Sequence, residues 1–267
     1  MSYGTRQTQL RNQFGNQSEA DGERGGQRRQ AVRDPSGLNP GEPAPGSLAA
    51  VKAFVGVTLA FWLGAVVFLG SRGDFVVPPG TPPYPIALGF AVPLILFLIV
   101  FWLSQRFRDF LMAADLPLLT AVQAWRFAGF GFIALYVYRV LPGAFAWPAG
   151  LGDMAIGMTA PWLALALVRR PSLASSRLFV VWNLLGILDL IVAVSDGALN
   201  QVLATGAAGE ISIAPMAQMP LLLIPAYLVP LFAMLHLTGL LQSRRMTQTL
   251  SSRSRYSSAA ASENPSV

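Results

Sequence analysis

The chain has 267 residues, of which 53% are hydrophobic and only 12% are charged, whereas soluble domains carry about 25% charged residues. This composition excludes an ordinary soluble domain and predicts an all-α, polytopic membrane protein whose first partner is the lipid bilayer. The net charge is +6, and in a membrane protein we interpret the basic residues as topology signals beside anionic lipid rather than as a nucleic-acid site. The chain has no cysteine, which excludes disulfides and thiol catalysis, and its single histidine excludes a His-rich metal site, so we expect no cofactor.

Two polar segments flank the apolar part of the chain. Residues 1–47 are rich in Gln, Gly, Arg, Asn and Pro and lack apolar periodicity, so they cannot bury enough surface to offset the entropy of ordering. We predict a disordered cytoplasmic tail over 1–47, a transmembrane domain over 48–242 and a second disordered cytoplasmic tail over 243–267.

The transmembrane domain contains six apolar runs, each long enough to cross a hydrocarbon core of about 30 Å as a helix. The runs cover residues 48–70, 86–105, 116–138, 149–168, 177–197 and 212–241. With the N-terminus placed inside, every Lys and Arg falls on the inner side except Arg72 and Arg139, which are outside, and Arg126, which is within a span. This asymmetry predicts six spans with both termini in the cytoplasm.

We single out three charged residues within these spans: Arg126, Asp153 and Asp189. A charge at mid-bilayer costs roughly 2.5–3.5 kcal/mol even on the lenient insertion scale, and such residues normally pair with one another or line a pathway. We therefore expect them to face a shared interior.

Small residues at helical spacing indicate which faces pack against other helices, because small side chains let backbones approach closely in lipid. In the fourth span this stripe is Gly150, Asp153, Gly157, Ala160 and Ala164. A similar stripe in the first span is Ala49, Ala53, Gly56, Ala60 and Gly64. We expect both stripes to face the interior.

These patterns predict a buried polar cluster with Arg126 at its centre and with Asp153 and Asp189 as counter-charges. Asn183 and Gln123 complete the predicted binding site as hydrogen-bond partners. The cluster could bind a small polar or anionic solute, or relay protons. Equally, an Arg–Asp clamp could fix the register of the helices and do no chemistry.

The sixth run contains four prolines, at positions 215, 220, 225 and 230. Each interior proline removes a helical hydrogen bond, so this span must bend against protein or a wet cavity. We place His236 near the inner end of this span and interpret it as a packing residue.

A shift of 57 residues aligns two parts of the chain. Trp125–Gly129 falls on Trp182–Gly186, and Gly150–Ile156 falls on Ala207–Ile213, which pairs Asp153 with Glu210. This alignment suggests that spans three and four and spans five and six form two parallel helical hairpins, an arrangement common in transporters.

Gly150-Leu151-Gly152-Asp153 resembles the Gly-x-Gly-Asp motif of the intramembrane aspartyl proteases, the presenilin and prepilin-peptidase type. That resemblance implies two aspartates sharing a proton, and the second would be Asp189. In that family the second aspartate precedes the motif, whereas here it follows. Arg126 nearby would also keep a carboxylate ionised, so this is the interpretation we favour least.

The stretch 123–160, with Trp-Arg-x-x-Gly and Pro-Ala-Gly-x-Gly-Asp, followed by Trp182-Asn183-x-x-Gly186-x-x-Asp189, resembles uncharacterised bacterial inner-membrane proteins of about six spans. The resemblance implies a bacterial inner membrane and no particular activity. Our leading functional prediction is a small-solute or ion permease. The alternative is a non-catalytic membrane partner or assembly subunit, acting with another protein or as a homo-oligomer.

Overall fold

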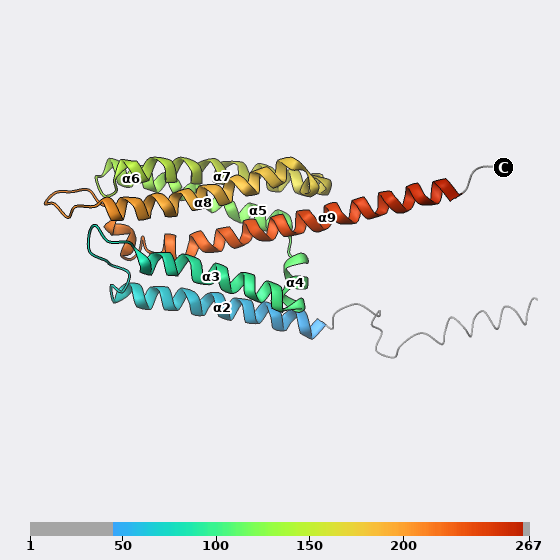
Figure 1. The fold of residues 1–267 in the computed structure, drawn as a ribbon, viewed down its shortest axis with the longest axis horizontal. Coiled ribbons are helices and arrows are strands. Elements are labelled where there is room, and N and C mark those ends of the chain that lie inside the picture. The colour runs from blue at the N-terminus through green and yellow to red at the C-terminus, as the bar shows by residue number, and fades with distance from the viewer. Residues whose placement is uncertain (1–44, 264–267) are drawn as a thin grey trace, which may run out of the picture. The chain divides into compact units, whose positions relative to one another are not determined.

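The computed structural model describes residues 45–263, and within that range it is all-helical, as predicted. Six apolar segments there are long enough to cross a membrane, and the composition and these segments together make the chain an integral membrane protein. The elements, drawn in Figure 1, are α2 (Pro45–Ser71), α3 (Tyr84–Leu103), α4 (Gln105–Met112), α5 (Leu116–Val122), η1 (Gln123–Gly129), α6 (Phe130–Val137), α7 (Gly143–Arg169), η2 (Pro171–Ser175), α8 (Arg177–Leu203), η3 (Ala214–Ala217), η4 (Ile224–Leu228) and α9 (Val229–Glu263).

Polar caps mark where helices begin at one end of the bundle. The side chains of Ser104, Asp115 and Ser176 accept hydrogen bonds from backbone N–H groups in the first turns of α4, α5 and α8. Such caps satisfy donors that the first helical turn leaves without partners. We call this end of the bundle the 104–115 end and the opposite end, where residues 72–83 lie, the 72–83 end.

The third span is not a continuous α-helix. Its middle turn, η1, is a 3-10 helix of seven residues between α5 and α6. Runs of 3-10 helix this long are uncommon and often mark a functional or strained segment. Arg126 in this segment reaches α7, which packs on the third span, and α8, which packs on α7.

Close glycine contacts hold α7 against the third span. A Cβ atom at Gly157 would overlap the backbone of Arg126 and Phe127, and one at Gly150 would lie 3.0 Å from the carbonyl oxygen of Gly129. The predicted small-residue stripe of the fourth span therefore does face a helix interface. Ala160 and Ala164 on the same stripe are buried too.

The corresponding prediction for the first span is wrong. Gly56 and Gly64 of α2 have no atom within 4 Å of where a side chain would begin. The packed side of α2 carries Trp62, Val66 and Gly70 instead, which contact the segment around Leu222. Small residues permit close approach but do not specify it: of the glycines on α2, Gly70 lies at the contact and Gly56 and Gly64 do not, and Trp62 and Val66 supply the larger side chains.

The sixth span begins later than predicted. It runs from Ile224 to Gln248 rather than over 212–241, because residues 214–223 form the short helix η3 and turns. The span then starts with a π-helical turn, η4, before α9. The proline at 225 lies in this irregular turn, where a missing backbone N–H is tolerated.

The shift of the sixth span also removes the structural basis of the predicted repeat. Asp153 lies inside α7, whereas the residue aligned with it, Glu210, lies in the loop between α8 and η3. Gly206 and Gly209 give this loop two positive φ angles, 73° and 81°, so it cannot continue a helix. The two pairs of spans are therefore not equivalent at their acidic residues.

The predicted boundaries of the tails meet the structure only in part. The tail predicted over residues 1–47 lies almost entirely outside the described residues. At the other terminus, α9 continues through Glu263 beyond the predicted boundary at 242. Extending an existing helix needs no new nucleation, and the Ser, Arg and Ala of this segment are tolerated in helices.

Candidate functional site

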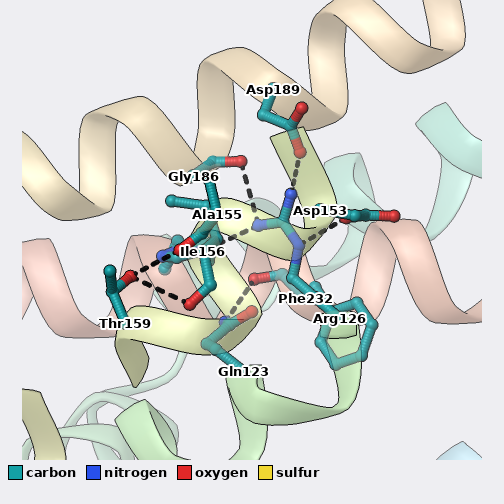
Figure 2. Close-up of polar contacts among 10 residues, drawn as sticks. Gln123, Arg126, Asp153, Ala155, Ile156, Thr159, Gly186, Asp189 and Phe232 are labelled. Carbon is teal, nitrogen blue, oxygen red and sulfur yellow. Dashed lines mark hydrogen bonds and ion pairs between the residues drawn. The ribbon is translucent and has the colours of Figure 1, made fainter. Parts of the chain in front are cut away.

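The ion cluster centres on Arg126, whose side chain has no exposed surface. Its Nε donates to Oδ1 of Asp153 at 2.7 Å, and its Nη2 donates to Oδ2 of Asp189. Figure 2 shows the guanidinium between these two carboxylates, which come from α7 and α8. The structure therefore brings together the three charged residues that the sequence singled out.

The remaining contacts of Arg126 are to groups that accept hydrogen bonds. Nη1 lies 3.2 Å from the carbonyl oxygen of Gly186, to which it donates, and 3.1 Å from Nε2 of His236. Arginine has no acceptor atom, so Nε2 of His236 must be unprotonated and accept this bond. The ring is therefore neutral and carries its proton on Nδ1.

That proton continues the network toward α8. Nδ1 of His236 lies 3.0 Å from Oδ1 of Asn183 and donates to it, and Nδ2 of Asn183 donates to the carbonyl oxygen of Phe179 at 2.9 Å. Every residue in this series of hydrogen bonds is buried, so each of its polar groups needs a hydrogen-bond partner. The network fixes α9 against α8 at one register.

Two glycines make room for these side chains. A Cβ atom at Gly186 would overlap the ring of His236, and one at Gly152 would overlap the carboxylate of Asp189. Trp182 also packs against His236, with ring centroids 5.2 Å apart, and its Nε1 donates to Oγ1 of Thr159 at 2.9 Å. The helix surfaces are thus shaped around the polar cluster.

Gln123 forms no hydrogen bond with Arg126 in the described part of the chain. Its Nε2 donates to the carbonyl oxygen of Phe232 at 3.2 Å (Figure 2). Its buried Oε1 has no hydrogen-bond partner among the described residues. Of the five residues predicted for the site, three are joined directly, Asn183 joins through His236, and Gln123 stands apart.

His236 is the member of the cluster that the sequence interpretation missed. With the sixth span taken as residues 212–241, His236 lay near its end, but in the span Ile224–Gln248 it lies near the middle. The rule that marked Arg126, that an ionisable group inside a span needs a partner, applies equally to this residue.

A cavity of about 80 Å³ lies between the ion cluster and the 72–83 end of the bundle. One water needs roughly 10–15 Å³ on this scale, so the cavity holds several waters or a small organic group. It is partly open, and its wall includes Phe75 and Pro83 near the loop and Asp153 at the cluster. Apart from Asp153 and Gln201, the wall is made of apolar residues.

The arrangement narrows the chemistry of the site. An aspartyl-protease dyad needs two carboxylates that share a proton, whereas here Arg126 lies between Asp153 and Asp189 and bonds to both (Figure 2). Within the residues that the structure describes, no group of three His, Asp or Glu side chains could hold a metal ion. The geometry therefore places one member of the ion cluster, Asp153, in the wall of an otherwise largely apolar cavity.

Residues 83–243 match a family model described as a domain of unknown function, DUF8737, and since this is more than half of the chain, the protein belongs to that family. The matched range includes every residue of the ion cluster and begins after α2. No curated protein and no solved structure matches the chain.

Proposed function

We propose that this member of a family of unknown function is a permease-like membrane protein that admits a small solute to the Asp153–Arg126–Asp189 cluster. The observation that carries the proposal is the partly open cavity whose wall includes Asp153. A buried ion cluster used only to hold helices together needs no access to it. Here Asp153 is 16% exposed in its side chain while Arg126, its partner, is 0% exposed.

The distribution of charge along the chain supports a topology for this proposal. The 72–83 end holds Arg72 and Arg139, and the 104–115 end holds the other basic residues of the short loops. By the positive-inside rule the cavity then faces the outside of a bacterial inner membrane, and both termini lie in the cytoplasm. Reporter fusions at the two termini test this orientation.

A test of permeation is re-swelling of proteoliposomes after hyperosmotic shock, followed by light scattering. We expect vesicles with the protein to re-swell faster than empty vesicles for at least one of urea, glycerol and methylammonium chloride. The acceleration should fall in Asp153→Asn and persist in Asp196→Asn, a control aspartate within α8 that does not line the cavity. Rates equal to those of empty vesicles for every solute contradict a permease.

A second candidate function is supported by the number of hydrogen bonds that Arg126 donates within the protein. Four of its N–H groups are directed at protein acceptors, as expected for a clamp that fixes helix register in an assembly subunit. This candidate expects a stable complex with another protein or a second copy of the chain. Cross-linking in native membranes, followed by the mass of the purified complex, distinguishes it from an independent permease.

A further inference from the structure

The charges of the cluster do not cancel. Arg126 contributes one positive charge, Asp153 and Asp189 contribute two negative charges, and His236 is neutral because its Nε2 accepts from Arg126. With both carboxylates ionised, one negative charge is left over within the membrane-spanning part of the chain. An uncompensated buried charge is strongly unfavourable and is removed either by a proton on one carboxylate or by a bound cation. A cation that enters the cavity can therefore take the place of that proton.

The geometry shows where that positive charge would bind. Oδ1 of Asp153 accepts from Arg126, and no hydrogen bond to its Oδ2 is formed within the described part of the chain. Asp153 is also the only charged residue in the wall of the cavity. A ligand in the cavity therefore meets a carboxylate, while Arg126 is sealed behind it and cannot reach an anion.

The rest of the wall favours a cation with an apolar body. Phe75, Phe132 and Phe145 line the cavity, and the rings of Phe132 and Phe145 pack edge to face with centroids 5.4 Å apart. Aromatic rings attract cations through their negative faces, and this attraction suits ammonium groups in desolvated sites. The other polar residue, Gln201, is neutral and donates to the carbonyl oxygen of Pro78 at 3.1 Å, so Asp153 sets the sign of the cavity.

We propose that the cavity binds a small organic monocation, with its ammonium group on Asp153 and its apolar part among the phenylalanines. The inference rests on the proposed function, since it names the class of solute that the permease-like site takes. Of the small polar or anionic solutes that the sequence suggested, it sets the anionic ones aside, because the side chain of Arg126 has no exposed surface.

The absence of cysteine from the chain allows a direct test with single introduced thiols. Ala193→Cys places a thiol in the cavity wall. Val192→Cys places one at the preceding position of α8, where the side chain is exposed. The purified proteins in lipid nanodiscs are treated with thiosulfonate reagents that carry a trimethylammonium, a sulfonate or no charge. Each rate is normalised to that of the same reagent with a free thiol.

We expect Ala193→Cys to react at least about tenfold faster with the cationic than with the anionic reagent, which corresponds to about 1.4 kcal/mol of attraction. Val192→Cys should show no such preference. Adding Asp153→Asn should remove the preference and Asp196→Asn should keep it. Butylammonium should protect the cavity thiol from the neutral reagent, whereas butanol and butyrate should not.

The remaining outcomes separate the two proposals. Equal rates for the three reagents, or faster reaction with the anionic one, overturn the cation and leave an accessible solute cavity. A thiol at position 193 that reacts only after denaturation overturns both the cation and the permease. If Asp153→Asn does not fold, the preference measured in Ala193→Cys alone and its retention in Asp153→Glu still decide the matter.

Discussion

The first two spans and the last four differ in how much of each helix is buried and in whether polar bonds join the helices. Only 6% and 0% of the most apolar stretches of α2 and α3 are buried, whereas half of the corresponding stretch of the sixth span is buried. The last four spans converge on Arg126, and the first two contribute no residue to that cluster. In lipid, helices gain little from hiding apolar surface, so polar bonds and close backbone contacts decide which helices must stay together.

The largest expected effect is the loss of Arg126. Arg126→Met leaves two carboxylates buried without their partner, and removal of one member of a buried ion pair costs about 3–5 kcal/mol. We expect a large drop in the thermal midpoint and in the yield of monodisperse protein. The measurement is thermal unfolding of the purified protein in detergent.

The matched control for this substitution is Arg72→Met in the loop after α2. Arg72 pairs with Asp74 at 3.3 Å, but both side chains are substantially exposed. Exposed ion pairs contribute about 0–1 kcal/mol, so its midpoint should stay close to that of the wild type. If the two substitutions had similar effects, the ion cluster would not be what distinguishes the last four spans.

A pair of glycine substitutions should have effects of opposite sign. Gly157→Ala places a Cβ atom into the backbone of the third span, which cannot move aside as a flexible side chain would, so we expect a loss of about 1–3 kcal/mol. Gly56→Ala on α2 meets nothing within 4 Å and should stabilise the helix by about 0.5–1 kcal/mol. Unfolding in a denaturing detergent measures both, and a gain at position 157 would show that α7 does not pack on η1.

The bond between His236 and Asn183 should appear as coupling between their substitutions. Each alanine substitution leaves a buried polar partner without its bond and should cost about 1–3 kcal/mol. Because the second substitution removes a bond that is already broken, the double variant should cost less than the sum by about 0.5–3 kcal/mol.

A remote pair supplies the reference for this coupling. Thr58 on α2 donates to the carbonyl oxygen of Phe54 and has no contact with the cluster. Thr58→Ala combined with Asn183→Ala should therefore be additive within about 0.3–0.5 kcal/mol. Additivity in the His236 and Asn183 pair as well would mean that the two residues do not form one network.

The difference between the two regions also explains how far the sequence could be interpreted. Apolar runs define the spans because the bilayer demands about 20 apolar residues, and this requirement is local in sequence. The prediction that Arg126, Asp153 and Asp189 converge rested on an equally simple requirement, that each charge buried in the membrane needs a partner. Both predictions needed no knowledge of which helices are neighbours.

Other features of the structure depend on which helices are neighbours, and the sequence interpretation missed them for that reason. The small-residue stripes of α2 and α7 look alike in sequence, but only the stripe of α7 packs closely against another helix, at the backbone of η1. The position of His236 depended on where the sixth span begins, and the prolines around residue 220 obscured that boundary. The cavity is lined by residues of α3, α6, α7, α8, η4 and the loops at the 72–83 end, and no single segment encodes it.

The smallest predicted effect concerns the loop after α8, far from the ion cluster. The carboxylate of Glu210 accepts hydrogen bonds from the backbone N–H of Thr205 at 3.0 Å and of Gly206 at 2.7 Å, and from the hydroxyl of Thr205. These hydrogen bonds lower the pKa of Glu210 below its usual value of 4.5, and those from Thr205 contribute most. Because the pKa in the folded state is depressed, the contribution to stability is complete above the usual value and is lost as the pH falls through the folded pKa.

Amide hydrogen exchange measures this loop directly. After correction for the intrinsic pH dependence of exchange, protection of the Thr205 and Gly206 amides should fall below about pH 4.5, and Glu210→Gln should lower it at neutral pH. The amide of Gly80, which donates to the carbonyl oxygen of Gln201 at the same end of the bundle, involves no carboxylate and should not change. If Gly80 lost protection in parallel, the acid would be loosening the whole 72–83 end, and the loop could not be treated as a unit independent of the helices that carry it.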